Sequence, residues 1–394
     1  IPTKNADGTY GVKEGQYVAE IGSKKYETLA DAIRLATKGK TITLLADVEQ
    51  NTQLTINKNI TLDLNGKTIR NTVDIWGDKA NAILSITNGA KVTITGNGTI
   101  DAKENDCYTI NVVKGDLTIE NGTFYGNVSV VQVEEGTLSV KGGTFDLHQK
   151  WEGSSKYLFN CIDSAFTSGN AKVAISGGTF VGFDPNVSPE QKVDGKTSSF
   201  AAPGVGITKN ENGSFTAAAG MTAQILDEDG NSVKAYSTLA EAVAAAEDGQ
   251  TVRLLADVAE SSINVNANIT IDLNKMTVTG SFVTYGEVTI QNGTIDVPDG
   301  ETNFAYGKLT LADVDITGKA ASSSLLSVNY NGSVTIDKDS TIVADSAKGD
   351  YPAVFIKGQD DSGKTYAPEL NIYGTVQSAK TPAVQGNGTD RGVS

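Results

Sequence analysis

The chain has 394 residues, and its 47 Asp and Glu against 32 Lys and Arg give a formal net charge of −15. This charge argues against nucleic acid or an anionic membrane surface as a partner, because both require clustered basic residues. No apolar run approaches the roughly 20 residues of a membrane span, so we expect no membrane insertion in this segment. With 42 Gly and 8 Pro, and Thr, Val, Ile and Asn in the periodic segments, the composition favours strands and turns over helices.

Residues 1–16 are predicted to be the tail of a preceding unit. Their sequence Thr3–Tyr10 is echoed by Thr208–Phe215, where a small turn and strand is expected to close a repeat. The predicted domains are therefore 1–16 as that tail, 17–207 as a first domain and 208–394 as a second. Two domains also suit a chain of this length.

The chain contains one architectural unit twice. Three segments of the first copy return in the second at an offset of 210 residues, or 209 for the last. They are Tyr26–Ile33, Thr41–Val48 and Ile60–Asn65, which return as Tyr236–Val243, Thr251–Val258 and Ile269–Asn274. A duplication with shorter repeats nested inside it predicts a solenoid.

Each unit is predicted to open with a short helix. Thr28 and Thr238 are candidate N-caps; Glu241 would complete a capping box in the second copy, with Asp31 as a weaker equivalent. The apolar residues of each helix fall on one face, namely Leu29, Ala32, Ile33 and Ala36, and then Leu239, Ala242, Val243 and Ala246. We interpret the helices as lids, because the end of a solenoid exposes an open core.

The strands that follow are short, alternate strictly, and end in turns such as Asn121-Gly-Thr and Gly142-Gly-Thr. These turns recur after 24 residues from Gly98 to Gly122 and after 21 to Gly143, which is the length of one parallel β-helix coil. One apolar position is followed by a second five residues later in six segments: Leu64/Ile69, Ile119/Phe124, Val140/Phe145, Ile175/Phe180, Ile290/Ile295 and Leu311/Ile316. Phe124, Phe145 and Phe180 are therefore expected to stack inside the solenoid.

Two cysteines, Cys107 and Cys161, fall in segments two coils apart. Coils rise about 4.8 Å each, so the pair would lie about 10 Å apart, beyond the roughly 7 Å limit for a disulfide. We predict free, buried thiols.

The longest insertion between coils begins at the single histidine, His148. With Trp151, Glu152, Lys156 and Tyr157 it forms a candidate sugar-binding patch, because an exposed indole stacks on a pyranose while polar neighbours hold its hydroxyls; Trp76 would extend the patch if the loops stack on one side. The alternative is that Trp151 and Tyr157 pack the loop onto the barrel.

Other candidate sites are read as turns. Asp227–Asn231 resembles a calcium-binding loop, but we predict a hairpin loop between two strands. We also predict a hairpin turn at Asp360-Asp361. We predict no catalytic residues, no metal site and no cofactor.

The lid sequence Thr-Leu-x-x-Ala-Ile/Val, the strand Gly-x-Thr-Ile/Val-x-Leu-Leu-Ala-Asp-Val and the Asn-Gly-Thr and Gly-Gly-Thr turns resemble the right-handed parallel β-helix repeats of the pectin-lyase-like superfamily. More narrowly, they are similar to large repetitive, adhesin-like surface proteins of Gram-positive gut bacteria. The resemblance implies an all-β fold of two tandem right-handed parallel β-helix solenoids, each opened by a short capping α-helix. It also implies a location outside the cell or on the bacterial surface.

The sequence determines the function less well than the fold, since related folds occur in lyases, hydrolases and adhesins. The pectate lyase pattern of stacked Asp residues with an Arg is not found around Arg70 or Arg253, and of the polygalacturonase motifs the chain has Asp360-Asp361 alone. We therefore expect a non-catalytic, adhesin-like structural segment that presents loops to a glycan or a host surface protein. The alternative is a carbohydrate-active enzyme, either a polysaccharide lyase or a glycoside hydrolase, or a degenerate relative of one.

Overall fold

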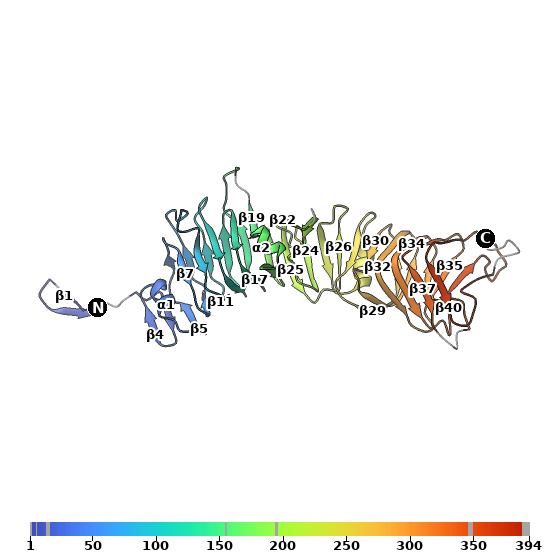
Figure 1. Cartoon of the computed structure of the whole chain (residues 1–394), viewed down its shortest axis with the longest axis horizontal. Coiled ribbons are helices and arrows are strands. Elements are labelled where there is room, and N and C mark those ends of the chain that lie inside the picture. The colour runs from blue at the N-terminus through green and yellow to red at the C-terminus, as the bar shows by residue number, and fades with distance from the viewer. Residues whose placement is uncertain are drawn as a thin grey trace. The chain divides into compact units, whose positions relative to one another are not determined.

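The computed structural model describes residues 2–4, 6–12, 16–153, 156–193, 196–345 and 350–387. It is an all-β structure in which most strand pairs are parallel (Figure 1). The chain forms two compact units, Ile1–Ala202 with Lys209–Ala218, and Pro203–Thr208 with Ala219–Ser394. The domain ranges 1–16, 17–207 and 208–394 stay predictions.

Unit 1 contains three main sheets. Sheet I has the order β20 (Ala171–Ile175), β17 (Gly136–Val140), β14 (Gly115–Ile119), β11 (Ala90–Thr95), β8 (Ile60–Asp63), β5 (Lys40–Leu44), β3 (Ala19–Ile21) and β4 (Lys24–Tyr26). Sheet II runs from β25 (Ser214–Ala219) through β21 (Gly178–Val181), β18 (Thr144–Leu147), β15 (Thr123–Gly126), β12 (Thr99–Asp101) and β9 (Thr68–Arg70) to β6 (Val48–Glu49). Sheet III is β19 (Tyr157–Cys161), β16 (Ser129–Val133), β13 (Tyr108–Val112), β10 (Ala82–Ile86) and β7 (Leu54–Ile56).

Smaller elements complete this part of the chain. They are the hairpins β1 (Pro2–Lys4) with β2 (Tyr10–Val12) and β22 (Ser188–Val193) with β23 (Lys196–Ser198), and the strand β24 (Val205–Lys209). Each pass of the chain through sheets I, II and III adds one parallel strand to each of them, because neighbouring strands in a sheet are separated by the two strands that lie in the other sheets.

The predicted phenylalanine stack is confirmed. Phe124, Phe145 and Phe180 occupy one register position in sheet II, and all three are fully buried. Their ring centroids lie 5.1 Å and 5.4 Å apart, with interplanar angles of 9°. Because one pass of the chain returns the same residue type to the same position, the rings meet inside the unit, where stacking adds about 0.5–1.5 kcal/mol per pair beyond burial.

One position in the predicted apolar column is wrong. Leu62, not Leu64, lies opposite Ile94 in sheet I, although Ile69 does lie opposite Ile100. The left-handed turn at Asn65 (φ 46°) and Gly66 (φ 72°) lengthens this connection, so a five-residue spacing does not hold here. Leu64 is instead buried beside the next turn, where a Cβ placed on Gly98 would lie 2.5 Å from the Leu64 Cβ.

Both predicted lid helices are present, as α1 (Leu29–Leu35) and α3 (Leu239–Ala245). Their predicted N-caps are confirmed: the Thr28 and Thr238 hydroxyls accept the backbone N–H groups three residues on, at 3.1 Å and 3.2 Å. Glu260 also caps α3, since its carboxylate accepts from the first two helical N–H groups at 2.8 Å each. A third helix, α2 (Asp163–Thr167), follows β19 and was not predicted.

Unit 2 is built on one 16-stranded sheet that winds through the unit. Its strands are β26 (Ala223–Leu226), β27 (Ser232–Tyr236), β28 (Thr251–Leu254), β29 (Val258–Val265), β30 (Thr270–Asp272), β31 (Thr277–Thr284), β32 (Glu287–Val297), β33 (Asn303–Ala305), β34 (Lys308–Gly318), β35 (Leu326–Asn329), β36 (Ser333–Ile336), β37 (Thr341–Ala344), β38 (Val354–Lys357), β39 (Glu369–Ile372), β40 (Thr375–Ser378) and β41 (Val384–Gly386). The predicted pairs are confirmed, because Ile290 lies opposite Leu311 and Ile295 opposite Ile316. Asn292 begins an Asn-Gly-Thr sequence like that of the predicted turn at Asn121, but it lies inside the continuous strand β32, with φ 61°.

Candidate functional site

The two predicted indoles lie in loops that connect sheet II to sheet III in unit 1. Loop 71–81 holds Trp76, loop 102–107 lies one pass later, and loop 148–156 holds Trp151. The intervening pass has the two-residue connection 127–128. Loop 148–156 therefore has room to reach across that tight turn to loop 102–107.

Asp106, in the middle loop, holds the loop of Trp76. Its carboxylate accepts the Ile75 and Trp76 backbone N–H groups at 3.0 Å each, and the Asn71 side-chain amide at 2.7 Å. Asp106 is itself 7 % exposed. Hydrogen bonds to a carboxylate are about twice as strong as neutral ones, so the backbone next to Trp76 is firmly fixed.

Asn105, the neighbour of Asp106, holds the other tryptophan loop. Its side-chain carbonyl accepts the Lys150 backbone N–H at 2.8 Å and the Trp151 backbone N–H at 3.2 Å. A salt bridge of 2.7 Å between Lys150 and Glu104 lies beside these bonds. Loop 102–107 thus fixes a tryptophan-bearing loop on each side.

Loop 102–107 is itself held by Asn127, which is fully buried in the two-residue connection 127–128. The Asn127 amide donates to the backbone carbonyls of Lys103 and Cys107 at 2.9 Å and 3.0 Å, and its carbonyl accepts the Asn105 N–H at 2.7 Å. The three loops therefore form one hydrogen-bonded platform, which we call the tryptophan platform (residues 71–81, 102–107 and 148–153).

Both indoles remain accessible on this platform. Trp76 is 50 % exposed and Trp151 69 % exposed. One edge contact supports Trp76, which lies 5.1 Å from the Tyr108 ring at an angle of 77°. Burial, with a smaller effect of the Glu134 carboxylate, raises the pKa of Tyr108, so its hydroxyl stays a hydrogen-bond donor.

The other predicted residues are spread over neighbouring surfaces. His148 stacks on Tyr125 with ring centroids 4.3 Å apart, and its Nδ1 lies 3.4 Å from an Asp101 oxygen, so it belongs to the surface of sheet II. Glu152 and Lys156 are exposed, and Tyr157 is half-buried at the start of β19. Within residues 16–153 and 156–193, no hydrogen bond, ion pair or ring contact joins His148, Glu152 or Tyr157 to either indole.

A row of four polar side chains, one hydroxyl and three amides, escaped the sequence analysis. Ser85, Asn111, Gln132 and Asn160 share one register position on the outer face of sheet III, between residues that point into the core. The Asn111 amide nitrogen donates to Asn81 and Glu134, at 3.1 Å and 2.8 Å, while its buried carbonyl oxygen has no partner. The row could have been found from the sequence, because a polar residue recurs next to the last residue of each of these strands.

Unit 2 carries a tyrosine row that the sequence analysis also missed. Tyr285, Tyr306, Tyr330 and Tyr366 lie side by side, with centroid distances of 5.2, 5.7 and 4.5 Å. The first pair is stacked at 9°, so each of these two rings covers one face of the other, and Tyr285 at the end of the row remains 52 % exposed. The repeated Tyr-Gly pairs at 285–286 and 306–307 were the available signal.

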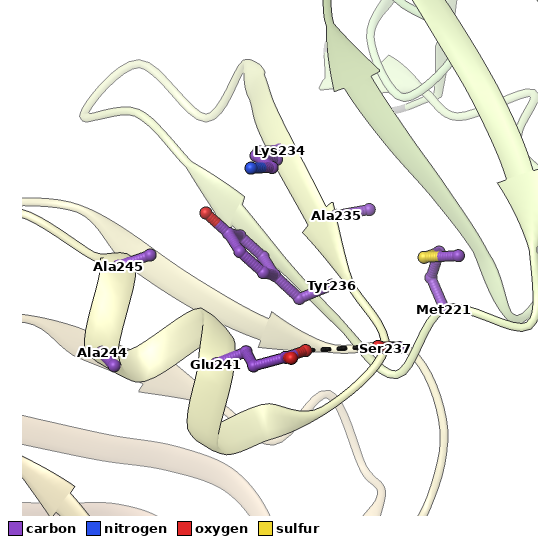
Figure 2. Close-up of a pocket in the computed structure, with 8 residues that line it drawn as sticks. All are labelled: Met221, Lys234, Ala235, Tyr236, Ser237, Glu241, Ala244 and Ala245. Atoms are coloured by element: carbon purple, nitrogen blue, oxygen red, sulfur yellow. Dashed lines mark hydrogen bonds between the residues drawn. The ribbon is translucent and has the colours of Figure 1, made fainter.

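The lid of unit 2 has a hollow of about 590 Å³ beside α3 (Figure 2). Its polar side chains are already engaged: Lys234 Nζ lies 5.0 Å from the centre of the Tyr236 ring, and the Glu241 carboxylate accepts the Ser237 hydroxyl at 3.2 Å. The lining residues are Met221, Lys234, Ala235, Tyr236, Ser237, Glu241, Ala244 and Ala245. Ala244 and Ala245 occupy the positions of Arg34 and Leu35 in the first copy, so the hollow arises from small residues at the end of the helix.

The remaining candidate sites have structural roles. In the described ranges, no group of three or more His, Cys, Asp or Glu side chains is placed to hold a metal ion. Asp227–Asn231 joins the antiparallel strands β26 and β27, and Asp360 lies in a hairpin closed by the pairing of Gln359 with Thr365, as predicted. Cys107 and Cys161 are buried thiols, as predicted.

Comparisons with protein-family models, with curated proteins and with solved structures find no match. The part of the chain that the structure describes contains no helix that is both long and apolar enough to cross a membrane.

Proposed function

We propose that the chain is a non-catalytic segment of a bacterial surface protein, built from two tandem right-handed parallel β-helices of the pectin-lyase-like type, and that its tryptophan platform binds a glycan. The β-helix interpretation is supported by the parallel register of the three sheets of unit 1 and by the resemblance of the repeats. The binding function depends on one observation: Asn105 and Asp106 fix the backbone of both exposed tryptophans.

A fixed, exposed indole is suited to sugars. It offers a flat apolar face to the C–H groups of a pyranose ring, and neighbouring polar groups can bind the hydroxyls. A loop that is rigid before binding loses less conformational entropy when the ligand arrives. The net charge of −15 disfavours acidic polysaccharides, so the proposed ligand is a neutral glycan.

The carbohydrate-active enzyme is the less favoured alternative. A glycosidase needs a general acid, whose pKa is raised by its surroundings, next to a second carboxylate. Asp360, in the pair that resembled such a motif, has the opposite electrostatics, because hydrogen bonds from the Ser362 and Tyr366 hydroxyls lower its pKa to about 2. The Asp360 carboxylate instead accepts hydrogen bonds within the hairpin.

A glycan array tests the binding proposal with four proteins. The wild type should bind neutral glycans, and Trp76→Ala and Trp151→Ala should each weaken binding at least tenfold. Tyr373→Ala is the matched control, since Tyr373 is an aromatic residue that is 71 % exposed and belongs to unit 2, whereas the platform belongs to unit 1. Equal signals from all four proteins would remove the proposal, and new reducing ends or unsaturated products from a polysaccharide panel would favour the enzyme.

A further inference from the structure

The hollow beside α3 can be compared with the same region of the first copy. The two copies align at an offset of 210 residues, and this alignment pairs each residue of α1 with one of α3. In both copies a lysine ammonium lies over a tyrosine ring of the preceding strand. The distance from Nζ to the ring centre is 5.3 Å for Lys24 and Tyr26, and 5.0 Å for Lys234 and Tyr236. The two copies therefore share this wall.

The helices that form the opposite wall differ. In α1, the Arg34 guanidinium forms an ion pair of 2.6 Å with the Asp31 carboxylate, and Leu35 is the next residue. In α3, Ala244 and Ala245 take the places of this arginine and leucine, and both line the hollow. The second copy thus lacks one basic and one branched aliphatic side chain at the position of the hollow.

Glu241, the counterpart of Asp31, has lost the cation that its counterpart has. Its carboxylate accepts the Ser237 hydroxyl at 3.2 Å (Figure 2). In the part of the chain that the structure describes, no Lys or Arg side chain forms a salt bridge with it. The Lys234 ammonium, which lines the same hollow, lies against the Tyr236 ring instead. The Glu241 carboxylate can therefore accept charge-assisted hydrogen bonds from a ligand.

The surface next to this carboxylate is apolar. Met221 and Tyr236 come from the hairpin of β26 and β27 and the residues before it, and Ala244 and Ala245 come from α3 (Figure 2). Tyr236 is half-buried, whereas Tyr26 in the first copy is 8 % exposed. The smaller helix residues of the second copy thus accompany a more accessible tyrosine. An aliphatic side chain placed here would remove apolar surface from water.

We propose that the hollow beside α3 binds a segment of a partner protein in which an arginine is followed by a branched aliphatic residue. The first copy carries this pair of side chains at the equivalent positions, as Arg34-Leu35. The guanidinium of the partner pairs with the Glu241 carboxylate, and the aliphatic side chain covers the Tyr236 ring. The net charge of −15 also favours a basic partner over an acidic one. All lining residues belong to unit 2, so the inference is independent of the tryptophan platform.

Methyl NMR of the full chain tests the proposal, because the chain has two methionines. Met221 lines the hollow, and Met276, which packs against the core of unit 2 and is not a lining residue, is the internal reference. The probe is the blocked dipeptide acetyl-Arg-Leu-amide, compared with acetyl-Glu-Leu-amide and acetyl-Arg-Ser-amide. The first should shift the Met221 signal saturably at a concentration on the order of millimolar, as suits so small a contact. The other two should need at least fivefold higher concentrations.

Two variants make the test specific. Ala244→Arg combined with Ala245→Leu restores the residues of the first copy and should abolish the Met221 response to acetyl-Arg-Leu-amide. Glu241→Gln removes the charge but keeps the hollow, so it should weaken binding of acetyl-Arg-Leu-amide at least fivefold and should not weaken that of acetyl-Glu-Leu-amide. An unchanged Met276 signal shows that each variant is folded. The proposal is overturned by the absence of a Met221 shift, by equal responses to the three dipeptides, or by full binding to the double variant.

Discussion

Asn105 and Asp106 are adjacent in the chain, and their side chains bind the backbones of two different loops. Asn105 accepts the Trp151 N–H, and Asp106 accepts the Trp76 N–H. One short loop therefore sets the positions of both exposed indoles. This relationship makes the platform a property of three connections on neighbouring passes of the chain and not of one insertion.

Replacing Asp106 by Asn should loosen the loop of Trp76. An amide offers one oxygen where the carboxylate offers two, and its NH₂ group would face the Ile75 and Trp76 N–H groups. Leaving buried donors without partners should lower the free energy of unfolding by about 1–3 kcal/mol. Urea denaturation followed by tryptophan fluorescence measures the loss.

The matched control is Asp74→Asn, on the same loop, because Asp74 is exposed and its contact is a surface salt bridge with Lys103. Such pairs contribute about 0–1 kcal/mol, so this variant should stay close to the wild type. Equal stability of the two variants would show that Asp106 does not hold the loop.

Phe145→Ala tests the core of unit 1. Phe145 is fully buried between Phe124 and Phe180 and also meets Phe159 edge-on at 5.1 Å. Removing its ring leaves a cavity inside a stacked column, and large-to-small changes of this kind cost about 3–5 kcal/mol. Thermal or urea unfolding of unit 1 should show this loss, and a cost below 1 kcal/mol would mean that the column closes around the gap.

The lowered pKa of Asp360 predicts a defined titration. Hydrogen bonds from Ser362 and Tyr366 lower its pKa to about 2, below the ordinary value of 3.8. A group whose pKa is lower in the folded state stabilises that state above its unfolded pKa and loses the contribution as pH falls through its folded pKa. The hairpin should therefore keep this contribution down to about pH 4 and lose it toward pH 2.

NMR titration of the Asp360 side-chain carboxyl carbon measures this pKa directly. Ser362→Ala should raise the midpoint, because it removes the hydroxyl that makes the largest contribution to the shift. A wild-type midpoint at the ordinary value would contradict the hydrogen bonds seen in the hairpin.

The internal stack could be predicted because it follows from periodicity. Phe124, Phe145 and Phe180 recur at the same point of each pass, so equal positions meet whatever the loops do. Leu64 was misplaced because the turn at Asn65 and Gly66 changes the spacing locally, and spacing alone cannot reveal a left-handed backbone.

The contacts that form the tryptophan platform do not recur with the sequence repeat. The sequence pointed to Trp76 and Trp151 as exposed aromatics. Asp106, however, is 30 residues from Trp76 in the chain, and Asn105 is 46 residues from Trp151. Long-range hydrogen bonds of this kind depend on how the loops pack against one another. Tyr285 and Tyr306 were missed for a different reason, since they lie at turns and not in the alternating strands that the analysis followed.

The two thiols provide the last prediction. Cys107 and Cys161 are each at most 2 % exposed, and burial raises the pKa of both, that of Cys161 to about 12. Because the thiolate is the reactive form, both should resist a thiol reagent at neutral pH in the folded protein and react fully in denaturant. Ellman titration in the two conditions gives the count of reactive thiols. Rapid native labelling of Cys107 would mean that loop 102–107 opens readily, and the tryptophan platform would then lack the rigidity on which its proposed glycan binding depends.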